Sequence, residues 1–306
     1  PQARIIGRNV SMLATDSAHN WQLTADQLDA HCAEDSGKPR VVILNYPSNP
    51  TGRTYNASEL ESIAEVARRH RLIVLSDEIY GETHHAGEHV SFSRWNPEGT
   101  IVSSGLSKWC GEGGWRLGTF TFPQELRWLL SAMASVASET YTSTSAPIQY
   151  AAVRAFRGGT DIERYLWQSR RVLAALGQWV AAALNAAGIA TLAPRGGFYL
   201  FPDFSPLSEA LRGKGILTSQ QLCEQLLEAT GVAILPGSVF GRHEGELTAR
   251  LAYVDFDGAR ALEALAQMPE DADIDQRFLE THCINVVEAT RRICRWARQG
   301  SAAEGL

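Results

Sequence analysis

Between residues 41 and 121 the chain alternates strand-sized apolar runs with a helical pattern, and this alternation constrains its fold more than any other feature. The apolar runs are VVIL at 41–44, LIVL at 72–75, TIVSSG at 100–105 and LGTFTF at 117–122. Residues 58–70 carry apolar side chains at helical spacing, with Asn56 or Ser58 as the expected cap. A helix between successive strands is typical of α/β proteins, so the sequence predicts a mostly parallel sheet.

The pattern changes in the second half of the chain. Residues 124–186 are mainly helical, with expected breaks near Pro147 and at Gly158 and Gly159. Beyond them, expected strands at 198–201, 232–235 and 249–254 alternate with helices near 219–229 and 258–267, and residues 273–298 have the pattern of one amphipathic helix. We therefore predict a large domain at 1–160, a bridging helix at 161–187, and a smaller α+β domain at 188–306 that ends in an extra helix.

Composition limits the possible partners and the compartment. A formal net charge of −6 gives no reason to expect nucleic acid or an anionic membrane surface as a partner. The apolar runs are far shorter than the roughly 20 residues of a membrane helix. Five widely spaced cysteines without a CxxC pair indicate reduced thiols and a cytoplasmic protein. Because the chain begins at Pro1 within what reads as mid-domain sequence, we expect its large domain to lack an N-terminal part.

The segment SSGLSKWCGEGGWRLG at 103–118 places a lone lysine among small and hydroxylic residues after an expected strand. A lysine that acts as an amine nucleophile must lie near a carbonyl and be partly desolvated, and Lys108 has that context. Arg116 offers a planar fork suited to a phosphate, and Ser107 can add a hydroxyl donor. The alternatives for these residues are a solvated surface lysine and a structural arginine in a glycine-rich turn.

Two further motifs follow expected strands, at the sheet edge where open α/β sheets place their ligands. In NYPSNPTG, the side chain of Asn49 can donate a hydrogen bond towards a ring oxygen, although such a segment can also be only a turn. In LIVLSDEIYGE, the carboxylate of Asp77 needs a cationic partner, for which a protonated pyridine nitrogen is suited, unless it only caps a helix. Tyr80 lies three residues further on and can present its hydroxyl to the same ligand.

SNPTG, SDEIY and GLSKxxxxxGWRLG, in this order and spacing, resemble the class I/II aminotransferases, which are pyridoxal-phosphate enzymes of fold type I. The resemblance implies that Lys108 is the Schiff-base lysine, that Asp77 pairs with the ring nitrogen, and that Asn49 and Tyr80 donate to the ring oxygen. It further implies that Ser107 and Arg116 hold the phosphate and that Arg250, with Asn49, binds the substrate carboxylate. The family's sequence landmarks include GGFY at 196–199 and GVAILPGSVFG at 231–241.

The same resemblance implies a function. The chain would belong to an aminotransferase that moves an amino group between an α-amino acid and a 2-oxo acid, as a cytoplasmic homodimer. Lys108 would act as the general base and acid at Cα, and Asp77 would keep the ring nitrogen protonated. One departure from the pattern is Gly105, where many members carry a phosphate-binding Ser, a role that Ser103 or Ser104 could take.

Three alternatives remain open from the sequence. A C–S lyase or a cyclopropane-forming synthase uses the same lysine, aspartate and arginine, because fold does not determine the reaction. An aminotransferase-like domain can also serve as the effector sensor of a transcription regulator, which the sequence upstream of Pro1 would reveal. We expect no metal site: His84, His85 and His89 lack a matching set of ligands and are expected in a solvated loop.

Overall fold

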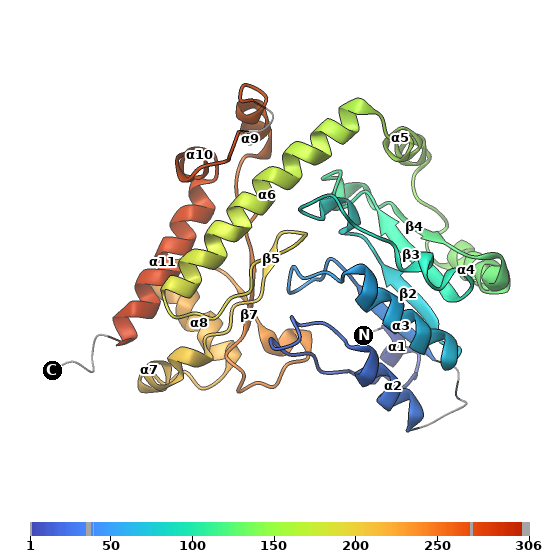
Figure 1. Ribbon diagram of the computed structural model, residues 1–306, viewed down its shortest axis with the longest axis horizontal. Helices are drawn as coiled ribbons and strands as arrows, with labels where there is room; N and C mark the ends of the chain where they lie inside the picture. Colours follow the sequence, from blue (N-terminus) through green and yellow to red (C-terminus); the bar gives the residue numbers. More distant parts are fainter. Residues whose placement is uncertain (1, 35–37, 39, 270–271, 302–306) are drawn as a thin grey trace.

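The computed structural model describes residues 2–34, 38, 40–269 and 272–301, and it confirms an α/β fold (Figure 1). Its larger sheet has the strand order β1-β2-β3-β4. The strands are β1 (Val41–Asn45), β2 (Ile73–Asp77), β3 (Thr100–Gly105) and β4 (Gly118–Thr121). The first three are parallel and β4 is antiparallel to β3. The carboxyl ends of β1, β2 and β3 therefore meet at one edge, as the motif positions required.

The predicted crossover helix is α3 (Ala57–Arg69), and Asn56 is its cap. The Asn56 side chain accepts a hydrogen bond from the Glu59 amide, and the Glu59 carboxylate accepts one from the Asn56 amide. Such a cap stabilises a helix by about 0.5–2 kcal/mol. The buried face of α3 packs with α2 (Ala25–Ala33) and with Leu44 and Val74 of the sheet in one hydrophobic cluster. A short helix, α1 (Gln2–Ile5), begins the described chain.

The helical middle of the chain comprises α4 (Arg127–Thr140), α5 (Ala146–Arg157) and α6 (Thr160–Ala186). Pro147 lies in the first turn of α5, where its missing N–H has no helical partner to lose, so the break precedes it. Gly158 and Gly159, with φ of 71° and 130°, form the second break. The long helix α6 covers nearly all of the range predicted for the bridging helix, and in Figure 1 it runs diagonally from beside α5 at the upper right to the lower left.

The smaller sheet is antiparallel, with the order β5-β7-β6. Its strands are β5 (Tyr199–Leu200), β6 (Leu235–Pro236) and β7 (Ala249–Ala252), and its neighbours include α7 (Ser208–Gly213), α8 (Ser219–Thr230) and α9 (Gly258–Leu265). One hydrophobic cluster joins these elements to the second half of α6. Because the core clusters of the first and second halves of the chain are separate, we propose the division at residues 160 and 187 as the domain boundaries.

The prediction of one terminal helix at 273–298 is wrong. The structure has two helices, α10 (Gln276–His282) and α11 (Ile284–Ser301), which meet at the fully buried Cys283. Cys283 leaves the helical region, with φ of −124° and ψ of 32°. The bend allows apolar residues of both helices to reach the same cluster, so the apolar pattern continues through the break and conceals it. Among the described helices, none is both long and apolar enough to cross a bilayer.

Candidate active site

Asp77 and Lys108 face a common space at the carboxyl edge of the larger sheet. Asp77 is the last residue of β2, and Lys108 follows the end of β3 by three residues. The Lys108 amine lies 5.7 Å from the centroid of the Tyr80 ring. Burial raises the pKa of Asp77 overall, and the charge of the Lys108 amine acts against that rise. No carboxylate among the described residues forms an ion pair with Lys108. The Lys108 amine and the Asp77 carboxylate are thus close enough to contact the same ligand.

The half-buried carboxylate of Asp77 is only partly satisfied. Burial is the largest influence on its pKa and raises it above the ordinary value of 3.8, while a hydrogen bond from the Ile79 amide and one from Asn45 act in the opposite direction. A carboxylate whose charged form is disfavoured by burial gains most from a cation placed against it. Asp77 therefore suits a protonated ring nitrogen.

Asn45 is a site residue that the sequence reasoning missed. It lies level with Asp77 on the neighbouring strand, and its side-chain nitrogen donates to Oδ2 of Asp77 at 3.2 Å. Its side-chain oxygen accepts from the backbone amide of Asn49 at 2.7 Å. Asn45 thus links the two predicted motifs. The signal available in the sequence was its place at the end of an apolar run, four residues before Asn49.

Asn49 and Arg250 are 201 positions apart in the sequence and in contact in the fold. The guanidinium of Arg250, in β7, donates from Nη1 to Oδ1 of Asn49 at 2.9 Å. It lies 4.6 Å from the centroid of the Tyr199 ring and 5.0 Å from that of Phe240. No carboxylate of the described chain pairs with it. A guanidinium held between aromatic rings without an anion is suited to bind the carboxylate of a ligand.

Tyr80 connects these two halves of the site. Its side chain is buried, and its hydroxyl donates to that of Tyr199 at 3.4 Å. Burial raises the pKa of Tyr80, and hydrogen bonding with Tyr199 adds to the rise. The hydroxyl therefore stays protonated at neutral pH and can act as a hydrogen-bond donor.

In the part of the chain that the structure describes, the two residues predicted to bind the phosphate, Ser107 and Arg116, form no side-chain hydrogen bond with each other or with the rest of the site. Ser107 is half-buried, whereas Arg116 is exposed, has a φ of 56° and donates from Nη1 to the Gly113 carbonyl in its own turn. Among the described residues, the partners of Arg116 are Gly113 of its own turn and Thr144, whose hydroxyl donates to the Arg116 carbonyl, and neither is a predicted site residue. Gly105 has no room for a larger residue, because a Cβ there would lie 2.6 Å from the Leu117 carbonyl oxygen.

The expectation of a solvated histidine loop is wrong for all three histidines. His85 is half-buried with Nε2 3.1 Å from the Gly197 carbonyl oxygen, and burial lowers its pKa. His84 is buried, and burial lowers its pKa to about 4. Nε2 of His89 lies 2.9 Å from the carboxylate of the buried Glu78, directly after Asp77. Glu78 is satisfied by several further donors, so these histidines belong to the packing beneath the site.

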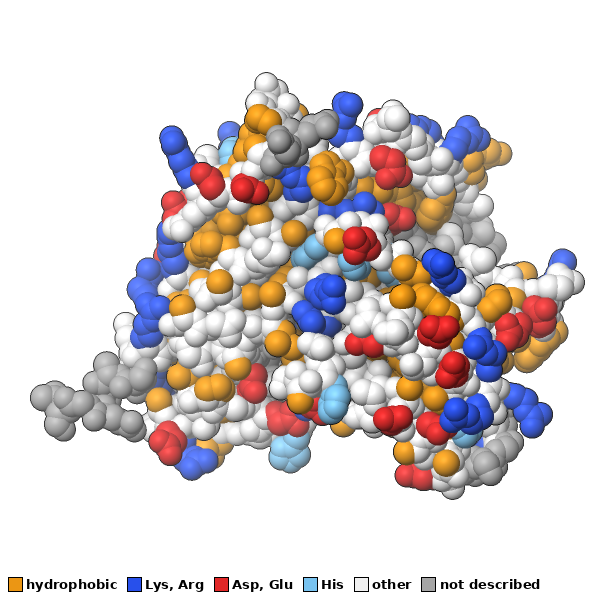
Figure 2. Space-filling model, in the orientation of Figure 1, with side chains coloured by type: hydrophobic (Ala, Val, Ile, Leu, Met, Phe, Trp, Pro, Cys, Tyr) orange, Lys and Arg blue, Asp and Glu red, His pale blue; other side chains and the backbone are white. Residues whose placement is uncertain are grey.

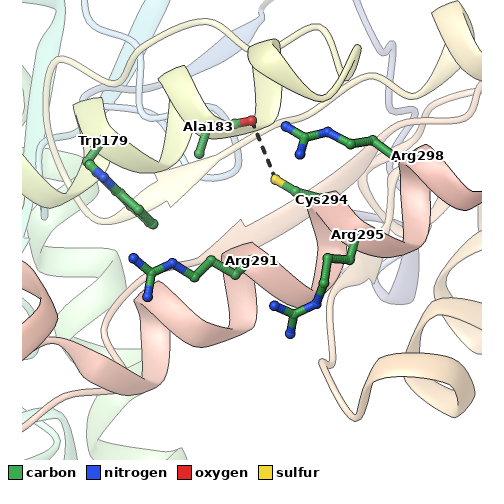
Figure 3. A pocket seen from close by; sticks show the side chains of 6 residues that line it. All are labelled: Trp179, Ala183, Arg291, Cys294, Arg295 and Arg298. Atoms are coloured by element: carbon green, nitrogen blue, oxygen red, sulfur yellow. Dashed lines mark hydrogen bonds between the residues drawn. The ribbon is translucent and has the colours of Figure 1, made fainter.

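A cavity of about 420 Å³ opens beside Lys108, between the loop after β3, the first half of α6 and the residues around α9. A second pocket, of about 260 Å³, lies between α6 and α11 and is lined by Trp179, Ala183, Arg291, Cys294, Arg295 and Arg298 (Figure 3). There the Cys294 thiol donates to the Ala183 carbonyl, while Arg291 and Arg295 pair with Glu280 and Glu288. This second pocket contains none of the predicted site residues.

Comparison with known proteins decides the family. Residues 1–258 match the family described as aminotransferase class I and II. The chain belongs to this family. Aminotransferases of class I and II depend on pyridoxal phosphate, so the resemblance found in the sequence motifs is confirmed.

Similar class I/II members differ in the substrates that their names state. The chain is 32% identical to an aspartate aminotransferase of Bacillus sp. (strain YM-2) over 257 residues, which are 82% of the chain and 62% of that relative. It is 31% identical to aromatic-amino-acid aminotransferase 2 of Thermococcus litoralis, over 83% of the chain and 62% of the relative. The structure of a Rhizobium meliloti aspartate aminotransferase matches 97% of the chain and 66% of its own, at 26% identity and a TM-score of 0.76. The chain thus spans about three fifths of the length of these curated relatives.

Proposed function

We propose that the chain is part of an aminotransferase that moves an amino group between an α-amino acid and a 2-oxo acid, with pyridoxal phosphate held on Lys108. The observation that carries this proposal is the shared space in front of Asp77, Tyr80 and Lys108, with the guanidinium of Arg250 beside it, which forms no ion pair with a described carboxylate. These residues offer an amine, a carboxylate and a carboxylate-binding fork, which are the groups that the reaction requires.

The residues at the ring end fit pyridoxal phosphate. Lys108 would hold its aldehyde carbon, Asp77 would pair with the ring nitrogen, and Asn49 and Tyr80 would donate to the ring oxygen. For this the Tyr80 hydroxyl, which here donates to Tyr199, would turn its one proton to the ring oxygen. Since Oδ1 of Asn49 already accepts from Arg250, its amide nitrogen remains available as the donor. Ser107 and Arg116 would supply the phosphate contacts from the loop after β3.

The protein's own groups would handle binding and proton transfer. Arg250 would fix the α-carboxylate of the amino acid and thereby orient the bond from Cα to its proton. The Lys108 amine would take that proton as general base and later return it as general acid. When bound, the cofactor would accept the electrons left by that bond, and Asp77 would keep its ring nitrogen protonated for this purpose.

We also propose that the functional form is a homodimer. Large apolar side chains lie exposed on β4, α4 and α5, and Figure 2 shows apolar side chains at the surface on the right of the view, around α4 and α5. The most exposed side chains of this face, which includes the residue directly after α4, are Phe120, Trp128, Val136, Tyr141, Tyr150 and Val153. An exposed apolar area of this kind is typical of a protein–protein interface. Light scattering on the eluted protein should give twice the chain mass, and a single chain mass would contradict the proposal.

Covalent labelling tests the function directly. With pyridoxal phosphate the protein should develop a visible absorbance band, and borohydride reduction should fix the cofactor to the peptide that contains Lys108. Lys108→Ala should lose the fixation and lower turnover about 1,000-fold, because the amine is also the general base. The matched control is Lys214→Ala, which changes a lysine that packs on the Trp296 ring outside the site.

Two results would contradict this function. Full transamination by Lys108→Ala would show that Lys108 is not the reacting amine. Release of pyruvate and ammonia without need of an oxo acid would show that the chain belongs to a lyase instead. Transamination with 2-oxoglutarate as acceptor, lost in Lys108→Ala and kept in Lys214→Ala, is the expected result.

A further inference from the structure

The cavity beside Lys108 is large and mostly apolar. Its walls include Trp109 after Lys108, Leu173 of α6, and Phe198, Phe256 and Leu262 from the second half of the chain. Its volume of about 420 Å³ lies in the range of small-molecule sites, and a cavity of about 150 Å³ is already enough to bind benzene. A benzyl or branched aliphatic group therefore fits this space by size and by chemistry.

Of the residues that the structure describes, Lys108 is the only charged one that lines the cavity. The hydroxyl side chains in its wall are Thr83, Tyr165 and Ser169, and the indole N–H of Trp109 is a further donor that has no partner among the described residues. The Thr83 hydroxyl donates to the Tyr80 carbonyl at 2.7 Å. The side-chain carboxylate of an acidic substrate would have no guanidinium to pair with in this cavity, and burying an unpaired charge in a largely apolar site is costly in free energy.

The cavity is also placed correctly with respect to the groups that hold an amino acid. Arg250 stacks on Tyr199, whose ring centroid is 5.8 Å from that of Tyr80, and Lys108 lies on the Tyr80 ring. Phe198, which lines the cavity, has its ring centroid 5.6 Å from that of Tyr80 and 4.7 Å from that of Tyr199. An amino acid anchored at Arg250, with Cα near the Lys108 amine, would therefore lie beside this cavity, which can receive its side chain.

We propose that this cavity binds the substrate side chain, which makes the substrate an amino acid with a large apolar or aromatic side chain and not aspartate. This specificity rests on the proposed aminotransferase function. Among similar proteins both kinds of substrate occur by name, so family membership leaves the choice open.

The primary test compares substrates in the holoenzyme. The kcat/KM for phenylalanine or leucine should exceed that for aspartate at least about tenfold, as a pocket of this kind discriminates by roughly 10–200-fold per group. Turnover that favours aspartate overturns the specificity alone. Absence of turnover with every amino acid tested overturns the proposed function, so the two failures are distinguishable.

Variants at the cavity wall localise the effect. Ala259 lines the cavity and is otherwise exposed, so Ala259→Phe should fill the space and lower the kcat/KM for phenylalanine about tenfold while that for alanine stays unchanged. Ala266→Phe, at the exposed end of the same helix, is the matched control. Val254→Arg places a cation in the cavity wall and should raise the kcat/KM for aspartate relative to phenylalanine about fivefold. An unchanged ratio in both cavity variants overturns the proposal.

A binding measurement gives a readout without turnover. Calorimetry should show that 3-phenylpropionate, which has a carboxylate and a phenyl group but no amine, binds more tightly than succinate, and that Ala259→Phe removes the difference. Tighter binding of succinate to the unmodified protein overturns the proposal.

Discussion

The side-chain nitrogen of Asn45 donates a hydrogen bond of 3.2 Å to Oδ2 of Asp77, across the parallel pair β1 and β2. Through its oxygen the same amide holds the backbone of Asn49, which in turn contacts Arg250. One strand-end amide therefore connects the carboxylate proposed for the ring nitrogen to the arginine proposed for the substrate. The hydrogen bond lowers the pKa of Asp77 without cancelling the rise caused by burial.

We expect Asp77→Asn to stabilise the cofactor-free protein at neutral pH while abolishing transamination. Because the pKa of Asp77 is raised in the folded state, its contribution to stability is present below the ordinary value of 3.8 and is lost as pH rises through the folded pKa. Asn at this position cannot ionise, so the free energy of unfolding of the variant at neutral pH should be about 0.5–2 kcal/mol higher than that of the unmodified chain. Thermal melts from about pH 3 to 8 should show a higher Tm for Asp77→Asn than for the unmodified chain at neutral pH, and this difference should disappear as the pH is lowered.

The exposed Asp273→Asn is the control for this measurement, since its side chain is already in water. A lower Tm for Asp77→Asn than for the unmodified chain at neutral pH would contradict the account, because it would mean that the charged carboxylate is stabilised in the fold.

Gly105→Ala should destabilise the protein by about 1–3 kcal/mol. A Cβ at this position would lie 2.6 Å from the Leu117 carbonyl oxygen and 3.1 Å from Cα of Gly118, so the backbone of β3 or β4 must shift. Urea denaturation measures the loss. Gly114→Ala is the control, because a Cβ there meets nothing within 4 Å, and an equal effect of the two substitutions would rule out the steric explanation.

Local pattern was sufficient for several elements and for the breaks at Pro147 and Gly158, but not for the bend at Cys283. The strand ending in Asp77 and the helix capped by Asn56 were predicted because apolar spacing and capping act over a few residues. The break at Cys283 was missed because the apolar pattern runs through it. What decides that bend is burial against residues far away in the sequence.

The candidate site shows the same limit. Lys108, Asp77 and Asn49 could be picked out because each follows a strand, and parallel strands place their carboxyl ends together. The role of Asn45 depends on strand register, which no motif reveals, and the contact between Arg250 and Asn49 depends on how the two sheets meet. The buried state of His84 could not be read from a polar loop sequence either.

Arg250→Lys should raise the KM for the amino acid about 10- to 100-fold with a smaller change in kcat. The substitution keeps the positive charge but loses the planar fork that can hold a carboxylate with two parallel hydrogen bonds. It also removes the stacking on Tyr199 and Phe240. Steady-state kinetics decides the matter, with the exposed Arg277→Lys as control; an unchanged KM would show that Arg250 does not bind the substrate carboxylate.

Glu78→Gln should destabilise the protein by about 2–4 kcal/mol, because it removes the charge at the centre of a buried network. One oxygen of Glu78 accepts hydrogen bonds from Ser76 at 2.8 Å, from Ser91 at 2.9 Å and from the Phe92 amide at 3.1 Å. The other oxygen lies 2.9 Å from Nε2 of His89. The network ties the end of β2 to the loop at 89–92, directly beneath Asp77.

The pH dependence of this effect has a definite sign. Burial alone raises the pKa of Glu78, but the hydrogen bond and charge of His89, together with the two serine hydroxyls, bring it below the ordinary value of 4.5. A lowered pKa contributes stability that is present above 4.5 and is lost as pH falls through the folded pKa. The difference in unfolding free energy between the unmodified chain and Glu78→Gln should therefore shrink as the pH falls below about 4. A difference that grew on acidification would show that the carboxylate is held in its neutral form.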